Sequence, residues 1–354
     1  MGRRVLSRLG KGGERGSVVV ITAIFLTALL GFSAMAVDVG FLMWQKRELQ
    51  NVADAAALAG VQELPDDPDA AVEVATDYAQ RNGAGSGRWV LESVQVLPAG
   101  CTAADRDCVT VEVRVSYPDA PFFMARVLGH STATVRVSAQ AAIQSPDISD
   151  NVMPWALKDS ARRQARYGDV VTVKYSAQGG TRGNFGALVI PNPECGRDQG
   201  AHLYRCNIEN GATVRVGQGY DTEPGNMTGP TRQGLQARLG GTDSRCDTFQ
   251  EVFEETEEGQ WRFRDERCNP WADNGQGSKR VVLIPVISDE DLQGRTRVTV
   301  LGFAVAFLED FQCSSGNECD VRVRFVQALM SANELMHFGP FNPNSDIIVP
   351  RLTN

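Results

Sequence analysis

The chain has 354 residues and a formal net charge of -8, with 42% hydrophobic and 22% charged residues. That length is enough for roughly two domains, and the composition is typical of a globular protein, which excludes disorder throughout. Because a phosphate-binding surface needs clustered Lys and Arg, the acidic balance also disfavours a nucleic-acid partner.

The N-terminal segment combines a basic tail with an apolar run. Five basic residues lie within residues 1–16: Arg3, Arg4, Arg8, Lys11 and Arg15. The twenty residues from Val18 to Val37 carry no charge, and a helix of that length spans about 30 Å, the thickness of a hydrocarbon core. Since basic residues stay on the cytoplasmic side, the sequence predicts a cytoplasmic tail over 1–16, one membrane span, and a body outside the cytoplasmic membrane.

A cleaved secretory signal is the alternative, because Ala34-Met35-Ala36 fits a small-x-small cleavage site. Beyond that point, however, apolar residues continue at helical spacings, namely Leu49, Val52, Ala53, Ala56 and Ala57. We therefore predict one helix over residues 17–63, stopped by Pro65, whose first half crosses the bilayer. Asp38, near the outer end of the apolar run, either reaches the lipid headgroups or meets a specific partner.

Three strings stand out in this segment: Arg15-Gly16, then AVDVG at residues 36–40 and LQNVADAAALAG at residues 49–60. Through them Gly16–Gly60 resembles the N-terminal Tad segment of bacterial TadE/TadG-like proteins, which are associated with assembly of Flp (tight-adherence) pili. The resemblance implies a non-enzymatic component of pilus or surface-appendage assembly, anchored in the bacterial cytoplasmic membrane. Its partners would be the lipid bilayer and pilus-assembly or envelope proteins.

The second half of the predicted helix carries a face of small residues that permits close helix approach: Ala53, Ala56, Ala57 and Gly60. Together with Asp38, these are the candidate helix-packing and assembly residues that the resemblance implies. The same face is equally suited to packing on the protein's own body.

The sequence departs from the family pattern at two places. Val20 stands where relatives processed by a prepilin peptidase have Glu, and Asp147-Ile148-Ser149-Asp150-Asn151 lacks the second Ser of a D-x-S-x-S metal motif. We therefore assign neither that processing nor a von Willebrand A domain. A weaker similarity to extracytoplasmic parts of other Tad-segment proteins rests on GNFG at 183–186, TEPG at 222–225 and Gly229-Pro230.

The body is predicted to be α+β. Residues 64–145 form a small unit, with a helix over 70–81, strands over 89–97, 109–117 and 132–143, and a short helix over 121–128. Turn formers within Gln144–Asn151 place a domain boundary there. Residues 146–354 are expected to be β-rich, with a helix over 231–239 and strands over 169–176, 185–191, 213–217, 280–287, 296–308 and 320–328.

All eight cysteines follow the apolar run, in four sequence-local pairs: Cys101 with Cys108, Cys195 with Cys206, Cys246 with Cys268, and Cys313 with Cys319. An even number outside the membrane favours disulfide bonds in an oxidising compartment, whereas buried free thiols are the alternative. Although eight cysteines allow 105 connectivities, pairing within each local pair is the simplest, because each pair falls in one loop or hairpin.

Few residues suggest chemistry. His130, His202 and His337 are widely spaced, Asp289–Gly294 does not meet the ligand positions of an EF-hand, and the acidic run Glu251–Glu258 is typical of a solvated face. The sequence therefore predicts no catalytic residue, cofactor or metal. An anchored or secreted ligand-binding module and a hydrolase remain alternative functions, and a hydrolase would show a cleft with paired acids of shifted pKa. The oligomeric state stays open.

Overall fold

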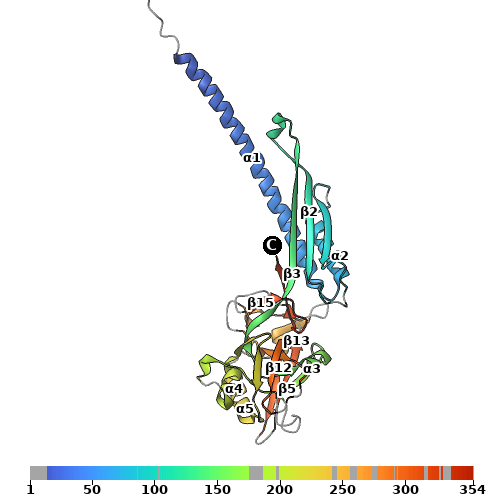
Figure 1. The fold of residues 1–354 in the computed structure, drawn as a ribbon, viewed down its shortest axis with the longest axis vertical. Coiled ribbons are helices and arrows are strands. Elements are labelled where there is room, and N and C mark those ends of the chain that lie inside the picture. The colour runs from blue at the N-terminus through green and yellow to red at the C-terminus, as the bar shows by residue number, and fades with distance from the viewer. Residues whose placement is uncertain are drawn as a thin grey trace, which may run out of the picture. The chain divides into compact units, whose positions relative to one another are not determined.

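The computed structural model describes residues 14–85, 87–102, 104, 106–174, 186–196, 199–240, 245–255, 261–272, 277–290, 292, 294–314, 318–326, 328–329 and 336–353. The fold is α+β, as the sequence predicts, and the chain divides into two compact units (Figure 1). One unit comprises Met1–Ala141 with Leu352–Asn354, and the other comprises Ala142–Arg351. Parts of several stretches named above lie outside the described residues: the tail to residue 13, residues 175–176, 185 and 327 of three predicted strands, residues 183–185 of the GNFG string, residues 256–258 of the acidic run, and residues 291 and 293.

The first unit begins with a 47-residue helix, α1 (Glu14–Gly60), which confirms the long helix that the sequence predicts (Figure 1). At 1.5 Å per residue it is about 70 Å long. A short 3-10 turn, η1 (Val61–Glu63), follows before the chain becomes extended at Leu64. The helix ends there because the next residue is Pro65, whose ring is incompatible with a helix interior.

The rest of the first unit packs on the C-terminal half of α1. Helix α2 (Pro68–Arg81) begins at Asp67, whose carboxylate accepts a hydrogen bond from the Ala70 N–H at 2.9 Å. Strand β2 (Thr110–Pro121) pairs with β1 (Val90–Leu97) in antiparallel register and also with β3 (Thr132–Val152). The alternating valines of β2 are buried, and α1 contacts both α2 and β2. A 3-10 turn, η2 (Ala125–Leu128), lies between β2 and β3.

Strand β3 is longer than the sequence indicates. The turn formers within Gln144–Asn151 do not form a turn there, because those residues continue the strand. Within the second unit, Gln144 to Ser149 pair with β15 (Met336–Pro340), and Ile148 to Val152 pair with β7 (Ala212–Arg215). Pairing on both edges satisfies the backbone groups of this segment, and that tertiary context overrides the turn-forming tendency of Pro, Asp and Ser.

The second unit contains most of the strands. Its other strands are β4 (Leu157–Lys158), β5 (Val170–Lys174), β6 (Leu188–Val189), β8 (Gly219–Thr222), β9 (Phe253–Glu255), β10 (Trp261–Phe263), β11 (Val281–Ile287), β12 (Arg297–Cys313), β13 (Cys319–Val326), β14 (Ala328–Leu329) and β16 (Ile347–Leu352). Its helices and 3-10 turns are α3 (Asp159–Gln164), η3 (Pro193–Cys195), α4 (Gly200–Asn210), α5 (Thr228–Leu239), α6 (Phe249–Val252) and η4 (Glu266–Cys268).

The core of the second unit lies on both faces of β11 and β12. These strands pair in antiparallel register, β13 pairs with β12, and β5 pairs with β13. Because side chains alternate along a strand, Phe303 and Phe307 of β12 join one buried cluster with Phe249 and Phe253. The residues between them, such as Ala304 and Ala306, join a second cluster that α4 and α5 cover with Tyr204, Ile208 and Leu235.

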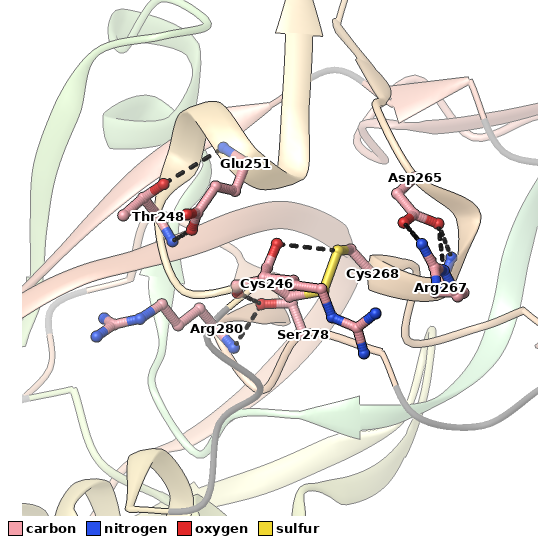
Figure 2. The surroundings of a disulfide bond; sticks show 9 residues. Cys246, Thr248, Glu251, Asp265, Arg267, Cys268, Ser278 and Arg280 are labelled. Atoms are coloured by element: carbon pink, nitrogen blue, oxygen red, sulfur yellow. Dashed lines mark hydrogen bonds and ion pairs between the residues drawn. A yellow bond between two sulfur atoms is a disulfide. The ribbon is translucent and has the colours of Figure 1, made fainter.

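The structure joins the eight cysteines in the four sequence-local pairs. Figure 2 shows the pair Cys246–Cys268, which links the residues before α6 to η4. Around this bond, the Ser278 hydroxyl donates to the Cys246 carbonyl at 2.7 Å, and Thr248 and Glu251 form a capping box at the start of α6 (Figure 2). The disulfide therefore fixes a region whose helices and strands are short.

Candidate functional site at Asp38 and the turn between β2 and β3

Asp38 is the one charged residue between Ser17 and Trp44, and it lies on α1 beside the β2–β3 turn. Its side chain is 4% exposed. Oδ1 accepts hydrogen bonds from the N–H groups of Phe123 at 2.8 Å and Met124 at 3.1 Å. Oδ2 accepts from Met124 at 3.1 Å and from Ala125 at 2.7 Å. The specific partner of Asp38 is therefore the backbone of a turn that lies more than eighty residues away in the sequence.

The geometry of the turn explains why it receives a carboxylate. The first N–H groups of a helix have no acceptor within that helix, and the N–H groups of residues 123–125 precede or begin η2. A carboxylate is favoured at this position because the donors converge and carry partial positive charge. Asp38 thus caps η2 from α1, and it ties the turn to the helix.

An aromatic pair strengthens the same contact. The rings of Phe41 and Phe123 meet edge to face with centroids 4.9 Å apart, and Trp44 lies one turn further along α1 with its ring 6.0 Å from Phe41. Edge-to-face packing is a favourable arrangement for aromatic rings. The turn is therefore held to α1 by a charge-assisted cap and by an apolar contact about one helical turn apart.

A cavity of about 640 Å³ lies between the turn and the apolar part of α1. From α1 it is lined by residues between Thr27 and Val39, and from the turn by Phe122, Met124, Ala125 and Val127. Most of these side chains are apolar. Three outward side chains of the turn are also apolar: Phe123 is 52% exposed, Met124 48% and Val127 88%. The surface beside Asp38 is thus a continuous apolar one, shared by helix and turn.

The small-residue face of α1 lies elsewhere, in the core of the first unit. Ala53, Ala56 and Ala57 are fully buried, and Gly60 is buried against α2. A Cβ placed on Gly60 would lie 2.5 Å from the carbonyl oxygen of Ala71 and 2.7 Å from the Cβ of Ala75. Of the two alternatives that the sequence leaves open for this face, the structure shows packing on the protein's own body.

The residues that the sequence offers for chemistry either lie far apart or already form hydrogen bonds within the protein. His130, His202 and His337 are exposed in separate parts of the chain. Asp289 accepts hydrogen bonds from the Ser160 hydroxyl at 2.6 Å and from its N–H, and these bonds lower the pKa of Asp289. Glu251 serves the capping box of α6. Among the described residues, no group of three or more His, Cys, Asp or Glu is placed to hold a metal ion.

The buried charges of the second unit serve its packing. Arg162 donates to both oxygens of Asp346 at 2.6 Å, and Tyr167 donates to the same carboxylate at 3.1 Å. Lys174 is buried, which lowers its pKa to about 8, and it donates to Asn226 at 3.2 Å. Arg238 donates to the carbonyl groups of Ile208 and Glu209 near the end of α4 and to the carbonyl group of Lys279. Each cation meets acceptors within the unit, as buried charges must.

Comparison with known proteins identifies the segment that holds Asp38. Residues 16–63 match the family model described as Tad, putative Flp pilus-assembly TadE/G-like. The match coincides with α1 and η1. No curated protein and no solved structure matches the chain. The chain therefore carries a Tad pilus-assembly domain formed by a long N-terminal apolar helix.

The apolar half of this helix has the length and composition of a membrane span. Its most apolar 18-residue window has a mean hydropathy of 2.4, and none of that window is buried within the protein. Large apolar side chains such as Phe25, Phe32 and Leu30 are more than half exposed. In a folded core these side chains would be covered, so their exposure is consistent with a membrane anchor.

Proposed function

We propose that this protein is a non-enzymatic, single-pass component of Flp/Tad-type pilus or surface-appendage assembly, anchored in a bacterial cytoplasmic membrane by α1. The observation that carries the proposal is the match of residues 16–63 to the Tad family model, over a helix whose apolar half is uncovered. Its partners are the lipid bilayer and pilus-assembly or envelope proteins.

The charge pattern and the cysteines support the orientation. Five basic residues precede the apolar run, which favours a cytoplasmic N-terminus. The four disulfides all follow the run, and disulfides persist in oxidising compartments outside the cytoplasm. Both observations support an extracytoplasmic location of the two units.

The continuity of α1 supports a role beyond tethering. The same helix that crosses the membrane supplies Leu49, Ala53 and Ala56 to the core of the first unit. A movement of the anchor is therefore a movement of that unit, without a flexible linker between them. Such a junction suits a component whose extracytoplasmic body must keep a defined orientation relative to other membrane-anchored proteins of an assembly machine.

The role can be tested in the bacterium that encodes the protein. We expect deletion of the gene to abolish surface pili, and the full-length chain supplied in trans to restore them. A variant in which an unrelated apolar helix replaces residues 18–37, while Asp38 and the rest of α1 are kept, separates tethering from specific packing in the membrane. Unchanged surface pili in the deletion strain would contradict the proposed role.

A further inference from the structure

We propose that the turn between β2 and β3 is a second membrane contact, which inserts Phe123, Met124 and Val127 among lipid acyl chains beside α1. This inference rests on the proposed membrane anchor, and it adds a lipid-binding surface that the anchor alone does not require. Three observations support this inference: the depth at which the turn is fixed, the exposure of its side chains and the hydrogen bonding of its backbone.

The depth follows from the Asp38 cap. Apart from Asp38, α1 carries no charge from Ser17 to Trp44, and Lys46 is the first basic residue beyond it. Those 28 positions correspond to about 42 Å of helix, which is the thickness of a bilayer with its headgroups. Asp38 lies within this length, and the turn is hydrogen-bonded to it. The turn is therefore held within one leaflet of the bilayer, the leaflet nearer to Trp44.

The lining of the cavity gives the same depth. Val127 and Met124 face a cavity whose opposite wall begins at Thr27 of α1, eleven residues before Asp38. Eleven residues span about 16 Å along a helix, roughly half of a hydrocarbon core. A cavity of about 640 Å³ with apolar walls on both sides is suited to acyl chains. The cavity is expected to hold lipid, because its surface continues directly into the uncovered apolar face of α1.

The exposed side chain of Val127 has no role inside the first unit, whereas Phe123 also packs against Phe41. Val127 is 88% exposed, so its side chain stabilises nothing within the protein. Arg126, which is also exposed, precedes it and has a stem long enough to reach the phosphate level. Trp44 is 53% exposed on α1 at the end of the uncharged length, the level at which tryptophan is enriched in membrane proteins.

Most N–H groups of residues 122–130 have acceptors, which favours entry into lipid, where an unpaired polar group is costly. The N–H groups of residues 123–125 donate to Asp38. Phe122 donates to the Ser131 carbonyl, Val127 to Met124, Gly129 to Arg126 and His130 to Ala125. The cap also shields the Asp38 carboxylate with four hydrogen bonds, which a charge at this depth requires.

Quenching by brominated lipid tests the insertion in the full-length protein. Three single-site variants carry the same fluorescent amino acid in place of Val127, Phe32 or Tyr78, and each is reconstituted into phosphatidylethanolamine–phosphatidylglycerol vesicles with bromine on the acyl chains. Phe32 lies on the apolar half of α1, and Tyr78 is a partly exposed aromatic residue of α2 in the same unit. Because Val127 has almost no contacts within the unit, the probe there leaves the fold intact.

We expect quenching at position 127 to be within about twofold of that at position 32 and at least fivefold stronger than at position 78. Quenching at 32 but not at 127 overturns the inserted turn and leaves the anchor standing. Absence of quenching at 32 overturns the anchor itself. A photo-crosslinking amino acid at position 127 in native membranes should yield lipid adducts, and a protein adduct as the main product would overturn lipid as the occupant.

Discussion

The two halves of α1 differ in composition and in surroundings: residues 18–37 carry no charge, whereas residues 45–60 contain Lys46, Arg47, Glu48 and Asp54. From Val18 to Val37 the large side chains of the helix are more than half exposed, whereas from Gln45 onward its inward face is buried. The first half has Phe, Leu, Ile and Val, and the second has mainly Ala and one Gly. Side-chain size thus distinguishes a helix face made for lipid from one made for close packing against α2 and β2.

The largest expected difference between the halves comes from a matched pair of leucine substitutions. Leu49 is fully buried and Leu29 is about half exposed. Leu49→Ala should destabilise the first unit by about 2 to 5 kcal/mol, because it removes buried methyl groups and leaves a cavity. Leu29→Ala should leave that unit unchanged. Hydrogen exchange of the β2 amides in the full chain measures both, and equal effects of the two substitutions would contradict the comparison.

A glycine pair should give the next largest difference. Gly60→Ala places a Cβ against the backbone of Ala71, which cannot move aside as a flexible side chain would. We expect it to destabilise the first unit by about 2 kcal/mol through overpacking. Gly40→Ala meets no atom within 4 Å and should be neutral or slightly stabilising, because alanine favours a helix. Thermal unfolding in detergent reports both, and a neutral Gly60→Ala would show that α1 and α2 are not closely packed.

The residues in these two pairs of substitutions also show which features of α1 can be predicted from the sequence. Apolar spacing and the Tad-like string predict the length of α1, its stop at Pro65 and the presence of the small-residue face. The sequence does not choose between a partner helix and the protein's own α2, because alanine and glycine suit either. That choice depends on Gly60 meeting Ala71 and Ala75, a contact that only the folded chain defines.

The cap on Asp38 predicts a smaller and more local effect. Asp38→Asn keeps the shape but turns an amide N–H₂ group toward backbone N–H donors, so at least one donor of the turn loses its acceptor. We expect a loss of about 1 to 3 kcal/mol in the local stability of the turn and faster exchange of the amides of residues 123–125. Asp54→Asn is the matched control, because Asp54 lies on the same helix and accepts its hydrogen bond from the Gln50 side chain, not from the turn. Unchanged exchange in Asp38→Asn would mean that the cap does not hold the turn.

The partner of Asp38 cannot be predicted from the sequence, and the reason is physical. A lone carboxylate near the end of an apolar run gives no sign of an acceptor site for N–H groups 85 to 87 residues away. The only available signal was the apolar string PFFM between two strands, which is unusual for a turn. Helix α4 was missed similarly, because its apolar positions become a face only when Tyr204 and Ile208 meet the second sheet cluster.

The smallest expected effect lies at the point where the two halves of α1 meet. Gln45 is fully buried, and neither Nε2 nor Oε1 has a hydrogen-bond partner in the part of the chain that the structure describes. Gln45→Met should therefore stabilise the first unit by about 1 kcal/mol, since it removes two unpaired polar atoms at similar volume. Gln50→Met should instead destabilise it, because Gln50 donates to Asp54 and to the Ser138 carbonyl. A destabilising Gln45→Met would reveal a partner for the buried amide.

Labelling of lysines from one side of the membrane tests most directly whether the uncovered half of α1 is a span with the body outside. Intact spheroplasts that express the full chain are treated with a membrane-impermeant amine reagent, and modified peptides are read by mass spectrometry before and after permeabilisation. We expect Lys279, which is exposed on the second unit, to be modified in intact spheroplasts, and Lys11 only after permeabilisation. Labelling of Lys11 in intact spheroplasts, protection of Lys279, or a soluble protein beginning at Val37 would contradict the anchor.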